Sequence, residues 1–421
     1  MHFENSLAFA RKTDSEDVLR EFRTEFHIPE INGKPCVYLT GNSLGLLPKA
    51  AEKAIKDELE DWKNLGVEGH FHGKNPWFHY HKFLTENAAL LVGAKPIEVV
   101  IMNQLSSNLH FLFVSFYRPN QTKFKIIMEA GAFPSDMYLV ESQVKFHGFD
   151  PAEAIIEVRP REGEHTLRHE DIIDVIEKNK DSVALVFFSG VQYYTGQVFD
   201  IENITNKAHE IGAVAGFDLA HAAGNINLEL HKWKVDFAAW CTYKYLNSGP
   251  GSVGGVFVNE KYANDSSLPR FAGWWGHEES VRFKMLKGFV PEAGAAGWQV
   301  SNAPILSMSV HKASLEIFAR AGVSRLIEKG KNLNAYLEYI IKDSIEQNPN
   351  LKLEIITPQY PERGCQISIL TDENGKALFD HLTQAGVISD WRNPNVIRMA
   401  PVALYNRFED IYRFGQALVS F

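Results

Sequence analysis

The chain has 421 residues, enough for one large domain and a smaller one, and its hydrophobic content of 45% and charged content of 23% are ordinary for a globular enzyme. The net charge of −9 argues against a nucleic-acid-binding surface, and no apolar run is long enough to span a bilayer. Three scattered cysteines without zinc-ligand spacing and an N-terminus unlike a signal peptide predict a cytoplasmic protein with no metal centre and no nucleic-acid or membrane partner.

The first part of the chain is expected to be mainly helical. Apolar spacing from Ser15 to Phe26 predicts a helical arm docked on the rest of the protein, and a longer helix is expected from Pro48 to Leu65. Residues 66–76 are predicted to be irregular and contain two histidines. A ligand-touching loop and simple surface exposure both remain open for His70.

Short apolar runs and amphipathic stretches then alternate along the chain. This alternation predicts an α/β fold, in which a mostly parallel sheet lies between helices. The predicted strands span residues 99–102, 124–128, 154–158, 183–188, 213–217, 236–240 and 255–258, and the predicted helices span residues 78–92, 109–116, 134–146, 169–179 and 201–211.

The pattern changes after residue 258. Aromatic loops come first, followed by helices and short strands that indicate a smaller α+β domain. We expect a large α/β domain over residues 67–303. The small domain is expected over residues 304–421, completed by about residues 1–66.

Two polar residues stand out at strand ends. Asp218 follows the predicted strand 213–217, Lys244 follows the predicted strand 236–240, and residues 220–234 are long enough for a crossover helix between them. Ligands of parallel sheets bind beyond the carboxyl ends of the strands, so both side chains are expected at one rim. A lysine among aromatic neighbours can form a Schiff base, and a carboxylate can keep a pyridine nitrogen protonated, as pyridoxal 5′-phosphate (PLP) requires. A helix-capping Asp and a structural Lys are the alternative.

Three further places suit such a ligand. Ser106, Ser107 and Asn108 precede an apolar helical run, where they could bind a phosphate or simply cap the helix. Phe133 ends a strand and could stack on a planar ring or belong to the core. Arg398 could bind a carboxylate through two hydrogen bonds or form a structural salt bridge.

Ten motifs, in order and correctly separated, give the chain a resemblance to a known family. Over nearly its whole length it resembles the kynureninases, which are fold-type I PLP enzymes of the aspartate aminotransferase superfamily. The motifs are GNSLGLLP, EGHFHGKNPW, MNQLSSNLH, AGAFPSD, FFSGVQYYTGQ, GFDLAHAAGN, CTYKYLNSGPGS, GWWGHEESVRFKM, VSNAPIL and WRNPNVIRMAPVALYN. The resemblance implies a large domain with a seven-stranded-type sheet and a smaller C-terminal α+β domain.

The resemblance also implies a role for each matching residue. Lys244 would be the Schiff-base lysine and proton carrier, with Tyr243 as an acid/base beside it, and Arg398 would bind the substrate α-carboxylate. The implied cofactor-binding residues are Leu105, Ser106, Phe133, Pro134, Ser135, Asp136, Asp218, His221, Tyr243, Lys244, Trp274 and Asn302, of which Trp274 and Asn302 would come across a dimer interface. The implied substrate-binding residues are Ser43, His70, His277, Ser301, Asn302 and Arg398.

The implied reaction is hydrolytic cleavage of the Cβ–Cγ bond of L-kynurenine, which gives anthranilate and L-alanine. The same reaction would convert 3-hydroxy-L-kynurenine to 3-hydroxyanthranilate and L-alanine, in tryptophan catabolism or NAD biosynthesis, by a homodimer with its active site at the interface. The polar pair His70 and Asn302 would suit a hydroxylated ring. Trp275, where relatives more often carry Phe, would change the shape of the ring pocket.

Two other interpretations remain. One is a different fold-type I activity, either an aminotransferase or a cysteine desulfurase-like lyase, although none of the cysteines is placed as a mobile nucleophile. The other is a non-catalytic PLP-binding dimer. The joint presence of Lys244, Asp218 and Arg398 argues against it, because a binding-only site has no chemical need for all three.

Overall fold

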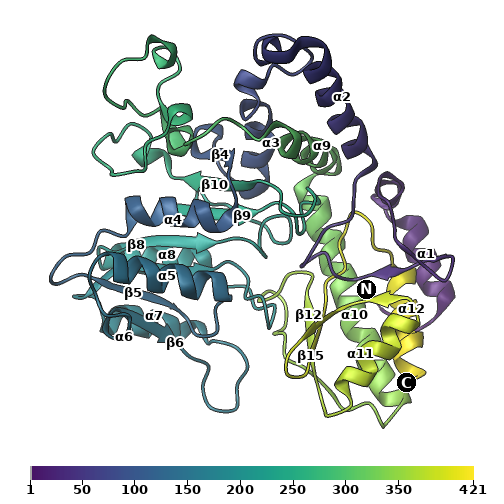
Figure 1. Cartoon of the computed structure of the whole chain (residues 1–421). Coiled ribbons are helices and arrows are strands. Elements are labelled where there is room, and N and C mark those ends of the chain that lie inside the picture. Colours follow the sequence, from purple (N-terminus) through teal and green to yellow (C-terminus); the bar gives the residue numbers. More distant parts are fainter. Residues whose placement is uncertain (1) are drawn as a thin grey trace.

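A computed structural model describes residues 2–421, and its centre is a seven-stranded sheet of order β4-β10-β9-β8-β7-β5-β6 (Figure 1). Strand β10 runs antiparallel to both of its neighbours, whereas the pairs from β9 to β6 are all parallel. The expected mostly parallel sheet is therefore confirmed. The strands are β4 (Val99–Met102), β5 (Lys125–Glu129), β6 (Ile155–Val158), β7 (Val183–Ser189), β8 (Val214–Asp218), β9 (Phe237–Cys241) and β10 (Gly254–Val258).

Helices cover both faces of this sheet because its strands are apolar on both sides. Side chains at alternate positions belong to different cores: Val186 and Phe188 of β7 pack in one, and Leu185 and Phe187 pack in the other. The first core contains side chains of α3 (Lys82–Val92), α7 (His169–Lys178), α8 (Ile201–Glu210) and α9 (Ile305–Ala321), and the second contains side chains of α4 (Leu105–Phe116) and α5 (Pro134–Phe146). The short α6 (Pro151–Ala154) precedes β6.

The crossover helix expected over residues 220–234 does not form, although β8 and β9 are parallel neighbours as predicted. The segment makes turns instead. Several of its backbone hydrogen bonds are local turn bonds, such as that from the N–H of Trp233 to the carbonyl of Glu229 (2.9 Å), and two go outward, from the N–H of Leu230 to the carbonyl of Val92 (3.1 Å) and from the N–H of His231 to that of Gly93 (3.1 Å). Local turn bonds, with two tertiary bonds to the end of α3, therefore satisfy backbone groups that a continuous helix would have paired.

The C-terminal part forms a third apolar core beside the large sheet, with both chain ends on the same side of the molecule (Figure 1). A four-stranded antiparallel sheet of order β11-β12-β15-β14 packs with helices there. The elements of the C-terminal part are α10 (Val323–Gln347), β11 (Leu353–Ile355), β12 (Ile367–Thr371), α11 (Gly375–Gln384), β13 (Val387–Ile388), β14 (Asp390–Arg392), β15 (Val396–Met399) and α12 (Phe408–Val419). The domain boundary at residues 303 and 304 stays a prediction.

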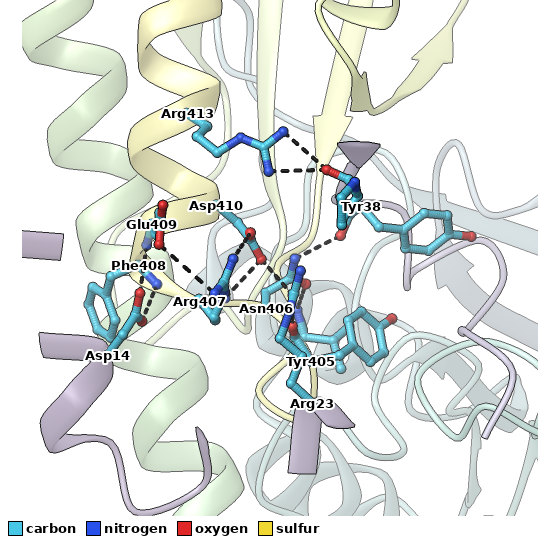
Figure 2. Close-up of polar contacts among 12 residues, drawn as sticks. Asp14, Arg23, Tyr38, Tyr405, Asn406, Arg407, Phe408, Glu409, Asp410 and Arg413 are labelled. Atoms are coloured by element: carbon cyan, nitrogen blue, oxygen red, sulfur yellow. Dashed lines mark hydrogen bonds and ion pairs between the residues drawn. The ribbon is translucent and has the colours of Figure 1, made fainter. Parts of the chain in front are cut away.

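The N-terminal arm docks on this C-terminal part, as expected (Figure 2). The carboxylate of Asp14 accepts hydrogen bonds from the N–H groups of Phe408 (2.7 Å) and Glu409 (3.0 Å), which begin α12. An ion pair joins Arg23 to the buried Asp410 at 2.9 Å. The arm thereby caps a helix that starts almost 400 residues later, because free N–H groups at a helix start need acceptors.

The shape of the arm differs from the single helix predicted over Ser15 to Phe26. Helix α1 (Leu7–Glu16) ends near the start of that range, and Arg20–Glu25 forms a separate 3-10 helix. The carboxylate of Asp17 accepts from the N–H of Leu19 at 2.8 Å, a local bond that breaks the helical path. The N-terminal elements are completed by β1 (Glu30–Ile31), β2 (Lys34–Pro35), β3 (Val37–Tyr38) and α2 (Lys49–Leu65), and no helix of residues 2–421 is long and apolar enough to cross a membrane.

A glycine in the centre of the large sheet allows a first prediction about stability. Gly255 lies opposite Trp240 in the β10–β9 pair, and a methyl group added to it would overlap the fully buried indole. We expect Gly255→Ala to lower the free energy of unfolding by about 2 kcal/mol or more, because the ring cannot move without disturbing its neighbours. Urea unfolding of the cofactor-free protein would measure this change.

The matched control for this substitution is Gly330→Ala. Gly330 lies within α10, has open space around it and needs no left-handed backbone. There we expect a gain of about 0.5 to 1 kcal/mol, because alanine restricts the unfolded chain at no steric cost. Equal effects of the two substitutions would contradict the overlap argument.

Candidate active site

A cavity of about 430 Å³ opens beyond the carboxyl ends of the parallel strands. Ser189 and Asp218 end β7 and β8, and Lys244 lies three residues beyond the end of β9. This is the rim where a parallel sheet is expected to bind its ligand. The cavity is lined by Gln104, Leu105, Ser106, Ser107, Phe133, Ser135, Asp136, Ser189, Val191, Tyr193, Asp218, Ala220, His221, Tyr243, Lys244, Gly251 and Ser252.

Lys244 is held by an imidazole and faces an aromatic ring. Its Nζ lies 3.0 Å from Nε2 of His221 and 5.8 Å from the ring centre of Phe133. Burial, followed by the charge of Lys244, lowers the pKa of His221 well below its usual value, so the imidazole is neutral and accepts this hydrogen bond. The other ring nitrogen of His221, Nδ1, is buried without a hydrogen-bond partner among residues 2–421. That nitrogen is available to a ligand in the cavity.

Two buried carboxyl groups of the cavity, those of Asp136 and Asp218, lie beside each other and interact directly. Burial raises the pKa of both, but the positive charge of Lys244 and a 2.7 Å bond from the N–H of Ala220 counteract this effect at Asp218. At Asp136 the negative charge of Asp218 raises the pKa further. One proton therefore resides on Asp136, and Asp218 carries the charge. An ionised carboxylate is thus directed into the cavity together with the lysine.

The start of α4 forms the opposite end of the cavity. The helix begins at Leu105, four residues earlier than predicted, so Ser106 and Ser107 lie in its first turn and line the cavity. The preceding residue, Gln104, makes no side-chain capping bond, so it leaves the N–H groups of the first turn free for an anion. Asn108 instead fixes the turn before the helix, donating to the carbonyl of Met102 at 2.9 Å.

Arg398 lies on β15 and is only 1% exposed; it does not line the cavity, but it contacts the backbone of Tyr193, which does. It donates to Asp390 from Nε (3.3 Å) and Nη2 (2.8 Å), and to the carbonyl of Tyr193 from Nη1 (2.5 Å). The structural salt bridge considered above is therefore present. A guanidinium has five N–H groups, so one on each terminal nitrogen remains, and these two can bind a carboxylate together. The charge of Arg398 also contributes to the lowered pKa of His221.

Eight predicted site residues do not line the cavity of this chain: Ser43, His70, Pro134, Trp274, His277, Ser301, Asn302 and Arg398. Trp274 is 43% exposed, and Ser301 and Asn302 are also exposed. His70 packs edge-on against Trp77, at 5.3 Å between ring centres, and its Nδ1 lies 3.0 Å from the carbonyl of Val67.

The sequence-based prediction missed several residues that do line the cavity. Ser189 ends β7 beside Asp218, and the strand-end rule that identified Asp218 could have identified it as well. Tyr193 packs edge-on against Phe133, with ring centres 5.1 Å apart and planes at 84°. Phe133 therefore belongs to the cavity wall and not to the core.

The cysteines do not suit a reactive nucleophile. All three are buried and free. Burial raises the pKa of Cys36 and Cys241, and it raises that of Cys365 to about 12. Thiols of this kind are inert at neutral pH, which argues against desulfurase chemistry.

Comparisons with known proteins agree with this geometry. Residues 37–367 match the aminotransferase class-V family, and residues 326–418 match the kynureninase C-terminal domain. Kynureninases of Flavobacterium psychrophilum and Myxococcus xanthus are 54% and 53% identical to the chain, over 99% of it and 98% and 97% of their own lengths. A cysteine desulfurase from Thermococcus onnurineus shares the fold, with a TM-score of 0.76 at 17% identity, over 95% of this chain and 97% of its own. The chain belongs to the kynureninase family, within the fold-type I enzymes of aminotransferase class V.

Proposed function

We propose that the protein is a PLP-dependent kynureninase that hydrolyses L-kynurenine to anthranilate and L-alanine, and 3-hydroxy-L-kynurenine to 3-hydroxyanthranilate and L-alanine. The observation that carries this proposal is the convergence of Lys244, the neutral His221 and the ionised Asp218 in one cavity. Relatives that are about half identical over nearly the whole chain bear the name kynureninase, which supports the substrate.

The residues present fit PLP. The free N–H groups at the start of α4 suit its phosphate, Asp218 suits its pyridine nitrogen, and the unpartnered Nδ1 of His221 suits a polar ring substituent. Phe133 can cover the ring face, and Lys244 can form the covalent link. When bound, PLP supplies an electron sink that makes the substrate Cα proton acidic.

The remaining steps, substrate binding and proton transfer, are assigned to individual side chains. Arg398 binds the α-carboxylate, and Lys244 removes the proton from Cα. Water adds to the γ-carbonyl, the Cβ–Cγ bond breaks, and the carbonyl carbon leaves as the carboxylate of anthranilate. Burial raises the pKa of Tyr243, so its hydroxyl stays protonated at neutral pH and can give a proton to Cβ.

The exposed site residues indicate a homodimer. Trp274 lies in a loop with other exposed apolar side chains, Phe283 and Met285, and such a surface is usually covered by a partner. We infer that this loop and Asn302 complete the cavity of a second copy of the chain. Three free, buried cysteines are in keeping with a reducing, cytoplasmic location.

His70 provides a test of ring specificity. Its polar ring is proposed to pair with a 3-hydroxyl group, so we expect His70→Trp to shift the ratio of kcat/KM values toward L-kynurenine by about tenfold. Initial rates with both substrates would measure the ratio. His72→Trp is the control, because His72 is exposed in the same loop and pairs only with Glu68 at 3.6 Å. An unchanged ratio in His70→Trp would remove His70 from the specificity argument.

The function as a whole is tested by an absorbance spectrum, followed by addition of each substrate. A visible band from the lysine–cofactor link, with fluorescent anthranilate formed on adding L-kynurenine, would support both cofactor and reaction. A band without product would keep the cofactor and overturn the reaction, and amino transfer to an added 2-oxo acid would identify an aminotransferase instead. No band after addition of PLP would overturn the whole proposal.

A further inference from the structure

Glu129 is a buried carboxylate beside the cavity that the proposed mechanism does not use. It ends β5 and is 2% exposed. Its carboxylate receives both hydrogen-bond donors of Ser189: the N–H, at 3.2 and 3.3 Å from the two oxygens, and the hydroxyl, at 2.6 Å from Oε1. Glu129 therefore holds one neighbouring residue by its backbone and its side chain at once.

Ser189 connects Glu129 to the cavity. It lines the cavity and is the register partner of Asp218 in the β7–β8 pair, so it lies beside the carboxylate that is proposed to meet the cofactor ring. The charge of Asp218 adds to burial in raising the pKa of Glu129, and Glu129 contributes to the raised pKa of Asp136. A second negative charge so close to Asp218 is unfavourable for stability.

The hydrogen-bond geometry fixes the direction in which Ser189 can act. A hydroxyl group has one proton and two lone pairs. Because the proton of Ser189 is directed to Oε1 of Glu129, the hydroxyl offers only lone pairs to the cavity. A ligand group opposite Ser189 must then be a donor, such as an N–H or O–H, because an acceptor there would face another acceptor.

We propose that Glu129 is a positioning residue that fixes Ser189, beside Asp218, as a hydrogen-bond acceptor for the protonated pyridine nitrogen of the bound cofactor. This inference rests on the proposed function, because it takes PLP as the ligand of the cavity. Glu129 itself touches neither cofactor nor substrate.

The test is a double-mutant cycle on PLP binding. The dissociation constant is measured by tryptophan fluorescence of cofactor-free protein, for wild type, Glu129→Gln, Ser189→Ala and the double variant. At about pH 8, above the pKa of about 7 to which burial raises Glu129, the wild-type carboxylate is ionised. In Glu129→Gln an amide NH2 group replaces one carboxylate oxygen, so a donor faces the N–H and hydroxyl donors of Ser189. We therefore expect PLP to bind about 3- to 10-fold more weakly.

The pattern among the variants identifies the route of the effect. If Glu129 acts through the hydroxyl of Ser189, the double variant should bind no more than about twofold worse than Ser189→Ala alone. If the double variant loses affinity for PLP by the product of the two single losses, the two residues act independently and the inference is overturned. It is also overturned if Glu129→Gln binds PLP as tightly as wild type. Wild-type protein that fails to bind PLP would overturn the proposed function instead.

Two further variants separate positioning from general stability. Glu98→Gln changes another fully buried carboxylate, which accepts from the N–H groups of Lys95 and Glu260 outside the cavity, and it should bind PLP within about twofold of wild type. Glu129→Asp keeps the charge but withdraws it from Ser189, and it should show the same loss as Glu129→Gln. If Glu98→Gln lost as much affinity for PLP as Glu129→Gln, the effect would reflect general stability and the positioning role would be overturned.

Discussion

Lys244→Ala is expected to abolish turnover, with a loss of at least about 10⁴-fold in kcat, together with the visible absorbance band of the lysine–cofactor link. The lysine is proposed both to bond the cofactor and to remove the Cα proton, and no second amine of residues 2–421 lines the cavity. Its removal also leaves Nε2 of His221 without its 3.0 Å partner. Product fluorescence and the absorbance spectrum of the same preparation would give both readouts.

The control for this substitution is Lys232→Ala. Lys232 lies on the surface and pairs only with Glu229, at 2.6 Å. Its replacement should change neither the spectrum nor the rate. Substantial turnover in Lys244→Ala, alongside normal activity in Lys232→Ala, would mean that the proton carrier has been misassigned.

Asp218→Asn is expected to lower kcat by about 10²- to 10³-fold while the fold stays intact. The substitution keeps the shape of the side chain but removes the charge that would hold a proton on the cofactor ring. Without that charge the ring withdraws electrons less strongly, so removal of the Cα proton becomes slow. Exchange of the Cα hydrogen of the substrate with deuterated water, measured by NMR, would locate the defect at this step.

Asp136→Asn is the informative comparison, because both carboxyl groups are buried in the same cavity. Burial, followed by the negative charge of Asp218, raises the pKa of Asp136, so Asp136 is already neutral and resembles an amide. We therefore expect a loss of less than about tenfold. Equal losses in the two variants would show that the charge is not confined to Asp218.

The strand ends were predictable because they depend on local sequence. Buried parallel strands are apolar throughout, so the first polar residue after each run, such as Asp218, marks the rim of the sheet. The segment 220–234 was predicted wrongly as a helix: its local backbone bonds form turns, and the N–H groups of Leu230 and His231 bond to the end of α3 instead. These two partners lie more than 100 residues away in the sequence, where no local pattern can indicate them.

Two other parts of the site depended on information that a single sequence does not hold. Glu129 follows an apolar strand just as Asp218 does, but only the structure pairs it with Ser189, 60 residues later. The loop residues Trp274 and Asn302 could be assigned through the family motifs alone, since they lie away from the cavity of their own chain. The resemblance therefore contributed most where the site is proposed to extend beyond one chain.

Arg398 has a consequence for the entropy of substrate binding. Its guanidinium joins β14 to the backbone at Tyr193, beyond β7, so it fastens the C-terminal sheet to the large sheet before any substrate arrives. The two terminal N–H groups are held in place by the bonds of their neighbours, and their rotational freedom is lost when the chain folds. The substrate carboxylate that we propose as the ligand of Arg398 would then bind to a group that is already rigid, so its affinity would not be reduced by the cost of ordering this arginine.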